Sequence, residues 1–213
     1  MEITRKKEKK KWKYLDLFSC YSDLFFTLIA IILGSPIFLI IAIGIKLEDS
    51  KGSIFFKQER IGKDGKPFLM YKFRSMYHGS EALLESLKQK NEMSGHMFKM
   101  KNDPRITKVG AIIRRLSLDE LPQLVNVLKG DMCLVGPRPA LKSEYEKYTV
   151  YDRQRTQVKP GCTGLWQVSG RNKLTFEEMV ELDIYYIKHQ SFKLDFKIIL
   201  QTFKEFTYKG SGY

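Results

Sequence analysis

The chain has 213 residues, 43% hydrophobic and 29% charged, so it is long enough for one domain with a proper core and too apolar for intrinsic disorder. Its formal net charge of +13 predicts an anionic partner, which could be nucleic acid, a phospholipid surface or a phosphorylated substrate. The three cysteines and three histidines are scattered, which argues against a zinc site or a Ser/His/Asp triad and favours free thiols in a reducing cytosolic setting.

Residues 1–23 begin with a run of lysines and arginines mixed with Trp12 and Tyr14. Cations interspersed with aromatic residues are typical of an amphipathic segment that lies against anionic lipid headgroups. A solvated, frayed tail is the alternative. We therefore expect the N-terminus to lie at a membrane surface.

Residues 24–45 carry no charge and are interrupted at their middle by Gly34, Ser35 and Pro36. Each half reaches only ~16 Å as a helix, about half of the hydrocarbon thickness. Lysines and arginines crowd both flanks, and such flanks stay cytoplasmic. These observations favour a re-entrant helix-break-helix with its break at Ser35 and Pro36, although a kinked spanning helix is the alternative. Residues 1–50 then form the membrane part and residues 51–213 a cytosolic, membrane-associated domain.

Short strand-like segments follow at 54–56 and 68–73, separated by the turn Gly62 to Gly65. In the second segment, alternation places Tyr71 and Phe73 on one face and the cations Lys72 and Arg74 on the other. Two cations on one face suit phosphate binding, but they are also common on ordinary surfaces. We expect a polar helix at 81–90, an adaptable methionine-rich loop at 91–101 and a short helix at 106–115.

Residues 116–139 hold the adjacent carboxylates Asp119 and Glu120 directly before an apolar helical pattern that ends near Gly130. Proline is tolerated in the first turn of a helix, so Pro122 predicts a helix that begins at about Leu118 or Asp119. The helix N-terminus would then favour the anionic form of Asp119.

The same two carboxylates also fit an ordinary helix cap. Asp is a preferred N-cap residue, and Ser117 with Glu120 matches a capping box. Capping and catalysis therefore both remain open for Asp119 and Glu120 from the local pattern alone.

Two further cations lie in restricted or glycine-rich segments. Pro137 and Pro139 flank Arg138 and limit its backbone, which lowers the entropy cost of holding a guanidinium against phosphate oxygens. Arg171 follows Gly170, where backbone can approach a ligand closely. Exposed arginines in turns are the alternative for both.

The C-terminal part predicts two helices. Thr175 and Glu178 form a capping box before a helix whose apolar side is interrupted by Asp183. Asp195 precedes an amphipathic helix with several phenylalanines, which we expect to dock on the core or at the membrane interface. The fold class is therefore α/β, mostly helical with a few short strands.

Lys72, Arg74, Arg114, Arg138 and Arg171, taken with the carboxylate pair and the membrane segment, describe a phosphate-handling site at a bilayer surface. The order of motifs resembles the bacterial sugar transferase family of small monotopic phosphoglycosyl transferases over about residues 15–207. The motifs that carry the resemblance are Asp23 with Ser35-Pro36, Tyr71 to Met76, Asn102 to Arg105, Ser117 to Leu124, Gly130 to Met132, Gly136 to Pro139, Pro160-Gly161, Gly170 to Asn172 and Glu181 to Tyr186.

The resemblance implies transfer of a phospho-sugar from a UDP-sugar to polyprenyl phosphate with Mg2+, releasing UMP at the bacterial inner membrane. By this likeness Asp119 is the nucleophile that forms a phosphoaspartyl-sugar, and Glu120 organises the metal or relays a proton. Asp183 is expected to contact substrate, and Asp195 to join Asp119 and Glu120 as a metal ligand. Downstream glycosyltransferases are implied partners, and a homodimer is compatible with the pattern.

The rival interpretation is a membrane-tethered protein that binds nucleic acid or anionic lipid through its cations. No RNA-binding or helix-turn-helix signature is visible, and the cations are dispersed among turns. A catalytically inactive scaffold is a third interpretation. The sequence favours the enzyme and predicts no nucleic-acid partner.

Overall fold

The computed structural model describes residues 2–83, 103–170 and 173–209, with backbone alone for residues 2–20, 81 and 206–209. The loop expected at 91–101, almost all of the helix expected at 81–90, and Arg171 lie outside the described residues. The helices are α1 (Glu2–Glu48), α3 (Lys108–Arg115), α4 (Gln123–Leu128), α5 (Lys142–Tyr145), α6 (Leu165–Ser169), α7 (Phe176–His189) and α8 (Phe192–Lys209). The strands are β1 (Phe55–Ile61), β2 (Pro67–Phe73), β3 (Cys133–Val135) and β4 (Gly161–Thr163).

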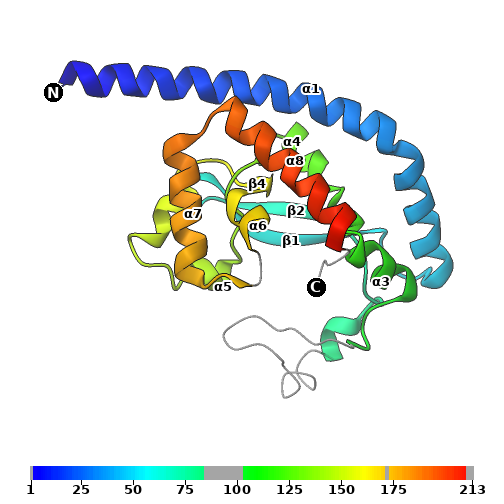
Figure 1. Cartoon of the computed structure of the whole chain (residues 1–213). Helices are drawn as coiled ribbons and strands as arrows, with labels where there is room; N and C mark the ends of the chain where they lie inside the picture. Colours follow the sequence, from blue (N-terminus) through cyan, green and yellow to red (C-terminus); the bar gives the residue numbers. More distant parts are fainter. Residues whose placement is uncertain (1, 84–102, 171–172, 210–213) are drawn as a thin grey trace.

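The expected mostly helical architecture with a few short strands is confirmed. The β1–β2 hairpin lies at the centre with helices around it (Figure 1). β1 and β2 pair antiparallel, from Phe55 opposite Phe73 to Ile61 opposite Pro67. The predicted turn between them is confirmed, with Asp64 and Gly65 both at positive φ. A second, parallel pair joins β3 to β4.

Helix α1 is continuous through Ser35 and Pro36 instead of breaking there, and it curves around the domain in its second half (Figure 1). Pro36 has no N–H to donate to the carbonyl oxygen of Ile32. The hydroxyl of Ser35 donates to that same oxygen at 2.8 Å, so the group that proline leaves unbonded is satisfied and the helix bends without ending. Within α1, residues Tyr21–Glu48 are long and apolar enough to cross a membrane.

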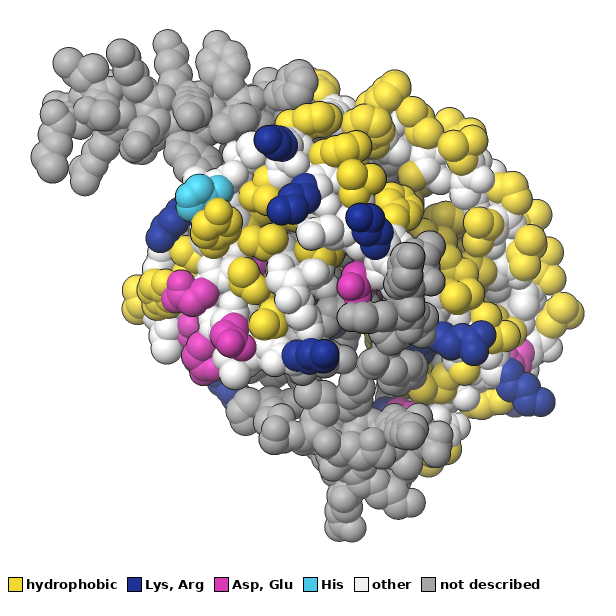
Figure 2. Space-filling view, viewed as in Figure 1, with side chains coloured by type: hydrophobic (Ala, Val, Ile, Leu, Met, Phe, Trp, Pro, Cys, Tyr) yellow, Lys and Arg dark blue, Asp and Glu magenta, His cyan; other side chains and the backbone are white. Residues whose placement is uncertain are grey.

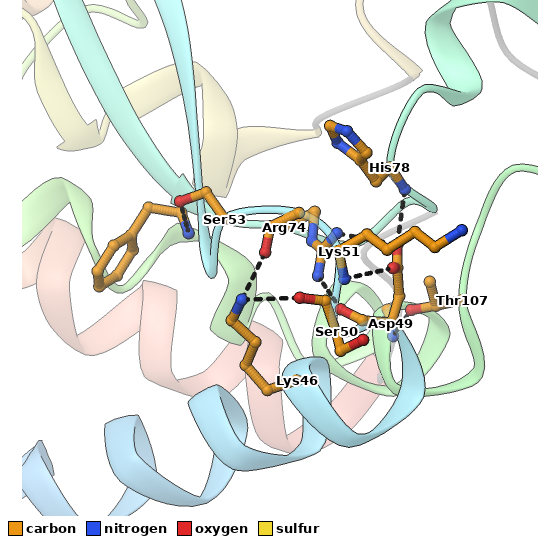
Figure 3. Close-up of polar contacts among 11 residues, drawn as sticks. Lys46, Asp49, Ser50, Lys51, Ser53, Arg74, His78 and Thr107 are labelled. Atoms are coloured by element: carbon orange, nitrogen blue, oxygen red, sulfur yellow. Dashed lines mark hydrogen bonds and ion pairs between the residues drawn. The ribbon is translucent and has the colours of Figure 1, made fainter.

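The C-terminal end of α1 is fastened to the domain by charged contacts (Figure 3). The carboxylate of Asp49 accepts from Nη1 of Arg74 at 2.9 Å and from the backbone N–H of His78 at 2.7 Å. Nη2 of Arg74 donates to the carbonyl oxygen of Asp49 at 2.5 Å. Lys46 donates to the carbonyl oxygens of Ser50 and Gly52. Because Arg74 directly follows β2, these contacts join α1 to the hairpin.

A neighbouring carboxylate joins α1 to α3. Glu48 accepts the backbone N–H groups of Lys108 and Val109 at 2.6 and 2.8 Å, which are N–H groups of the first turn of α3 that otherwise lack a helical acceptor. Thr107 caps the same helix by accepting from Gly110 at 2.8 Å. The position of α3 is therefore set from α1.

An apolar cluster continues this junction towards the Asp119 turn. Ile41 and Ile45 of α1 pack with Phe73 of β2 and Ile113 of α3, and Leu118 and Leu121 pack against them. These two leucines flank the carboxylate pair in the chain. Burial of Ile41 and Ile45 of α1 thus helps to fix the backbone on both sides of Asp119 and Glu120.

The last two helices form a second cluster with β3, in which Val135, Tyr186 and Ile198 are buried. The predicted capping box of Thr175 and Glu178 at the start of α7 is confirmed. Helix α8 begins at Phe192, so Asp195 lies in its first turn and does not precede it. Its other face exposes apolar side chains, Phe192, Phe196, Leu200 and Phe203. Figure 2 shows hydrophobic side chains gathered over α8 and the second half of α1.

Candidate functional site

The Asp119–Glu120 pair lies in a tight turn between α3 and α4. Ser117 has a left-handed backbone with φ of 52°, and Leu118–Glu120 form a 3-10 turn. The predicted start of the helix at Leu118 or Asp119 was wrong, because α4 begins only at Gln123, after Pro122. Pro122 lacks an N–H, so the ladder is interrupted there and the turn before it closes through a bond from Leu121 N to Leu118 O. The predicted end is confirmed by Gly130, at φ of 78°.

The capping interpretation of the pair is not supported in the described part of the chain. Ser117 makes no side-chain capping bond there, and neither does Pro122 at the start of α4. The carboxylate of Glu120 instead accepts from Nζ of Lys72 at 2.6 Å. The structure therefore favours an ion pair with Lys72 over a cap for Glu120.

The electrostatic environment of Asp119 differs from the expectation. A helix N-terminus was expected to favour its anion, but burial raises the pKa of Asp119 to about 6, and the charge of Glu120 raises it further while Lys72 and Arg114 lower it. The reason is that desolvation disfavours the charged form more than nearby cations favour it. Asp119 is therefore a carboxylate whose ionisation falls close to neutral pH.

Glu120 behaves in the opposite way. Burial by itself would raise the pKa of Glu120, but the ion pair with Lys72, together with the charges of Arg138 and Arg60, lowers it below its ordinary value. The two adjacent carboxylates thus have their pKa values moved in opposite directions, a pattern typical of sites that divide roles between two acids.

A buried asparagine places Lys72 opposite Glu120. The side chain of Asn126, on α4, accepts from the backbone N–H of Tyr71 at 3.0 Å and donates to the carbonyl oxygen of Leu69 at 2.7 Å. It therefore pairs with the edge of β2 as another strand would, and it ties the helix after the turn to the strand that carries Lys72. Asn126 is fully buried, so this tie is rigid.

A small polar pocket adjoins the pair, with a volume of about 50 Å3. We call it the polar pocket, and it is lined by Arg60, Met70, Lys72, Glu120, Gln123, Arg138, Pro139, Gly161, Cys162 and Gln167. The guanidinium of Arg138 is 34% exposed and lies 3.6 Å from the carboxylate of Glu144. Three cationic side chains and one carboxylate thus surround a space that fits a phosphoryl group.

A much larger apolar cavity, about 520 Å3, begins on the other side of Glu120. It lies between α1, α4 and α8, and we call it the apolar cavity. Its lining includes Phe26, Leu121, Leu124, Leu134, Val135, Phe192, Phe196, Ile199 and Phe203, with Asp23 and Asp195 in its wall. Glu120, Gln123 and Cys162 line both spaces, so the two meet at the carboxylate turn.

Arg74 and Asp183, which were predicted to bind phosphate and to contact substrate, form ion pairs with other residues of the protein. The side chain of Arg74 is committed to Asp49 at the end of α1, because the strand ends at Phe73 and Arg74 turns towards that helix. Asp183 is 1% exposed, and its carboxylate accepts from Nε of Arg155 at 2.9 Å and also from Nη2 of Arg155. Both side chains are thus engaged in ion pairs within the protein, and the contacts of Arg74 with phosphate and of Asp183 with substrate stay predictions.

The proposed metal ligands do not form a preformed cluster. Asp195 accepts from the hydroxyl of Tyr186 at 2.7 Å in the wall of the apolar cavity, and burial raises its pKa to about 6. Within the residues described here, no group of three acidic, histidine or cysteine side chains is close enough to hold a metal.

Three residues of the site escaped the sequence reasoning. Arg60 lines the polar pocket, Asn126 ties α4 to β2, and Arg155 neutralises Asp183. A signal existed for Arg60, since β1 alternation places it on the same face of the hairpin as Lys72. The sequence offers no comparable signal for the tie between Asn126 and β2, because Tyr71 and Leu69 lie more than fifty residues away.

The chain is similar in sequence to known bacterial sugar transferases. The family model described as bacterial sugar transferase matches residues 15–209. The galactosyl transferase CpsE of Streptococcus agalactiae serotype III is 53% identical over 154 residues, 72% of this chain and 34% of that protein. The undecaprenyl-phosphate galactose phosphotransferase of Salmonella typhimurium is 42% identical over 195 residues, 90% of this chain and 40% of that protein.

A shorter relative matches over most of its own length. The exopolysaccharide production protein ExoY of Sinorhizobium fredii is 38% identical over 184 residues, 84% of this chain and 81% of that protein. The chain spans two fifths or less of the two longer relatives. The family match covers nearly the whole chain, and it includes the turn and the residues of both spaces around it. The chain belongs to the bacterial sugar transferase family.

Proposed function

We propose that this protein transfers a phospho-sugar from a UDP-sugar to a polyprenyl phosphate such as undecaprenyl phosphate, releasing UMP. The product is a polyprenyl-diphospho-sugar that begins the synthesis of a capsule, exopolysaccharide or other surface glycan. The names of the relatives support the reaction class, since one is an undecaprenyl-phosphate galactose phosphotransferase and another a glucose-1-phosphate transferase. The observation that carries the proposal is the carboxylate turn, in which Glu120 lines both the polar pocket and the apolar cavity and Asp119 is its neighbour in the chain.

The reaction proceeds in two displacements. A carboxylate oxygen of Asp119 attacks the phosphorus that bears the sugar, and the bond from that phosphorus to the oxygen of UMP breaks, so UMP leaves with the electron pair. An oxygen of the lipid phosphate then attacks the phosphoaspartyl phosphorus, and the bond to Asp119 breaks. The carboxylate is regenerated and the lipid carries a diphosphate linked to the sugar.

Cationic side chains supply the charge stabilisation that phosphoryl transfer needs. Lys72 holds Glu120 at 2.6 Å, and Arg138 lines the same pocket with a partly exposed guanidinium. Arg114 contributes positive charge to Asp119. We assign to these three residues the neutralisation of charge on the transferring phosphate and the departing UMP.

The residues present fit a magnesium ion. Mg2+ takes oxygen ligands, and in phosphate-transfer sites it commonly uses one or two protein carboxylates together with substrate phosphates. Asp119 and Glu120 are adjacent carboxylates beside the polar pocket and would hold the ion with the diphosphate. When bound, Mg2+ would neutralise charge on the phosphates. Asp195 belongs to the wall of the apolar cavity, so we leave it out of this ligand set.

The membrane placement follows from α1 and α8. We propose that α1 enters the cytoplasmic leaflet and returns, so that both of its ends and the catalytic domain lie on the cytoplasmic face. Support comes from the curve of its second half (Figure 1), from Pro36 inside it and from the basic residues at both ends. The exposed phenylalanines of α8 would lie at the same interface. Labelling of a cysteine at position 5 from the outer face would contradict this topology.

The decisive experiment for the reaction is single-turnover UMP release in the absence of lipid acceptor. The wild-type protein is expected to release UMP from a UDP-sugar in an amount close to one per enzyme, as ping-pong kinetics require. Asp119→Asn is expected to release none, because an amide cannot attack the phosphorus. Undiminished release by Asp119→Asn would defeat the covalent mechanism, and absence of release by the wild type would defeat the proposed function.

A further inference from the structure

Arg60 is a buried guanidinium held by neutral groups. It lies on β1 and is 6% exposed. Its Nε and Nη2 donate to the side-chain oxygen of Gln58 at 3.2 and 2.7 Å, and its Nη1 donates to the carbonyl oxygen of Pro139 at 3.2 Å. In the described part of the chain no carboxylate forms an ion pair with it. A buried charge without a charged partner is costly, so its retention points to a ligand.

The surroundings of Arg60 make the polar pocket positively charged. Burial and the nearby charge of Arg138 lower the pKa of Arg60 to about 10, whereas Glu144 and Glu120 oppose that effect. Both carboxylates already have cationic neighbours, since Glu120 bonds to Lys72 and Glu144 lies 3.6 Å from Arg138. The repulsion between the two arginines would be relieved by an anion between them.

The backbone holds Arg60 in place against the Arg138 segment. The N–H of Ile61 donates to the carbonyl oxygen of Ala140 at 2.9 Å, so the end of β1 is bonded to the chain directly after Pro139. Three of the five N–H groups of a guanidinium are used by Gln58 and Pro139. The remaining two, one on Nη1 and one on Nη2, are left for a ligand in the pocket that Arg60 lines.

We propose that Arg60 is a phosphoryl-binding residue of the polar pocket, where it forms with Arg138 a two-guanidinium site for phosphate oxygens. This inference rests on the proposed function and adds to it a residue that the motifs did not identify. Arg60 is fixed before the ligand arrives, whereas Arg138 is a third exposed and adjusts. A fixed guanidinium loses little entropy on binding and selects the position of the phosphate.

The phosphate could be part of the nucleotide-sugar diphosphate or could belong to the lipid acceptor, and two probes distinguish these sources. UDP binding to the full-length protein in detergent is measured by calorimetry, and the KM of a short-chain polyprenyl phosphate is measured by turnover. Loss of a hydrogen bond to a charged group predicts that Arg60→Gln weakens one or both constants by roughly 10- to 100-fold. The constant that changes identifies the source.

A second arginine provides the matched control. Arg105 is also 6% exposed and bonds to Asp103 through Nε and Nη2, at 2.9 and 2.6 Å, outside both spaces. Arg105→Gln is expected to lower the thermal stability without weakening either probe. This separates loss of binding from general loss of stability.

The outcomes are distinguishable from failure of the reaction itself. If the wild-type protein releases UMP but folded Arg60→Gln keeps both constants within about twofold of wild type, Arg60 is not a phosphoryl ligand and the proposed function stands. If Arg60→Gln does not fold, Arg60→Lys decides, because it keeps a cation but loses the planar fork. Arg60→Lys is expected to weaken the affected constant by roughly tenfold, and unchanged constants in this variant would likewise overturn the inference.

Discussion

The polar pocket and the apolar cavity share Glu120, Gln123 and Cys162 but differ in charge and size. The pocket gathers Lys72, Arg60 and Arg138 around about 50 Å3, whereas the cavity is walled by aliphatic and aromatic side chains around about 520 Å3. The charged residues in the cavity wall are carboxylates, Asp23 and Asp195 in addition to Glu120, which would repel a phosphate. Under the proposed function, phosphates would enter the pocket and an apolar chain would enter the cavity. Glu120 lines both spaces, and Asp119 directly precedes it in the chain.

The strongest test of this division removes a cation from the pocket. Arg138→Ala is expected to lower kcat/KM for UMP release by about 10²–10³-fold, because a preorganised positive charge is lost where charge develops in the transition state. The measurement is initial-rate UMP release from a UDP-sugar.

The matched control for Arg138 is Arg153→Ala, since Arg153 is exposed and lies over the ring of Tyr145, 5.2 Å from its centroid. We expect that variant to retain wild-type rates. An unchanged kcat/KM in Arg138→Ala would show that Arg138 does not act in the reaction. It would also contradict the assignment of the polar pocket as the phosphate site.

A second test fills the cavity. Ile199→Trp places a larger side chain in the cavity lining on α8 and is expected to raise the KM for polyprenyl phosphate roughly tenfold, since loss of space for one or two methylenes has effects of this size. UMP release in the absence of acceptor is expected to stay unchanged. Leu200→Trp is the control, because Leu200 lies on the same helix but outside the cavity lining. Equal effects of the two variants would contradict an acceptor site in the cavity.

The contrast between local and long-range contacts explains how far the sequence predicted this site. The Gly62–Gly65 turn, the Thr175 cap, the end of the central helix at Gly130 and the carboxylate pair all follow from residues within a few positions of one another. The pairing of Arg74 with Asp49, of Asp183 with Arg155 and of Asn126 with β2 joins residues 25 or more positions apart. Periodicity and motif spacing do not report such pairs, so the sequence did not predict the ion-pair partners of Arg74 and Asp183.

The ionisation of Asp119 was missed for the same reason. A sequence can place a carboxylate near a helix start, but its pKa depends on how much of it the folded chain covers and on charges such as Lys72 and Arg114. Its neighbours Leu118 and Leu121 pack against an apolar cluster that includes residues of α1 more than seventy positions away. Burial raises the pKa of Asp119, whereas the helix N-terminus was expected to lower it.

The raised pKa of Asp119 predicts a pH dependence of the first half-reaction. The nucleophile must be ionised, so the rate of single-turnover UMP release is expected to rise with pH, with a midpoint near pH 6, and to fall tenfold per pH unit below it. Lys72→Met should move the midpoint upward, because burial raises this pKa and Lys72 is the foremost charge that opposes it. A flat profile from pH 5 to pH 8 would contradict this account of Asp119.

The smallest expected effect concerns stability. Because the pKa of Asp119 is raised on folding, the native state binds its proton more tightly than the unfolded state does. The cost of burying the charge is therefore absent below the unfolded pKa and grows as the pH rises through about 6. Each pKa unit corresponds to about 1.4 kcal/mol, and solvent screening of this partly exposed group reduces the total. Asp119→Asn is thus expected to stabilise the protein by about 1 kcal/mol at pH 8 while abolishing UMP release.

Thermal unfolding in detergent at pH 5 and pH 8 measures this difference. The gain in Tm for Asp119→Asn should be larger at pH 8, since only there is the buried carboxylate of the wild type charged. Asp64→Asn serves as the control, because Asp64 is exposed in the β1–β2 turn and its left-handed backbone also suits asparagine. A loss of stability in Asp119→Asn that grows with pH would mean that the environment of Asp119 favours its anion, and a gain that does not depend on pH would mean that folding does not shift its pKa. Either result would contradict the effect of burial described here.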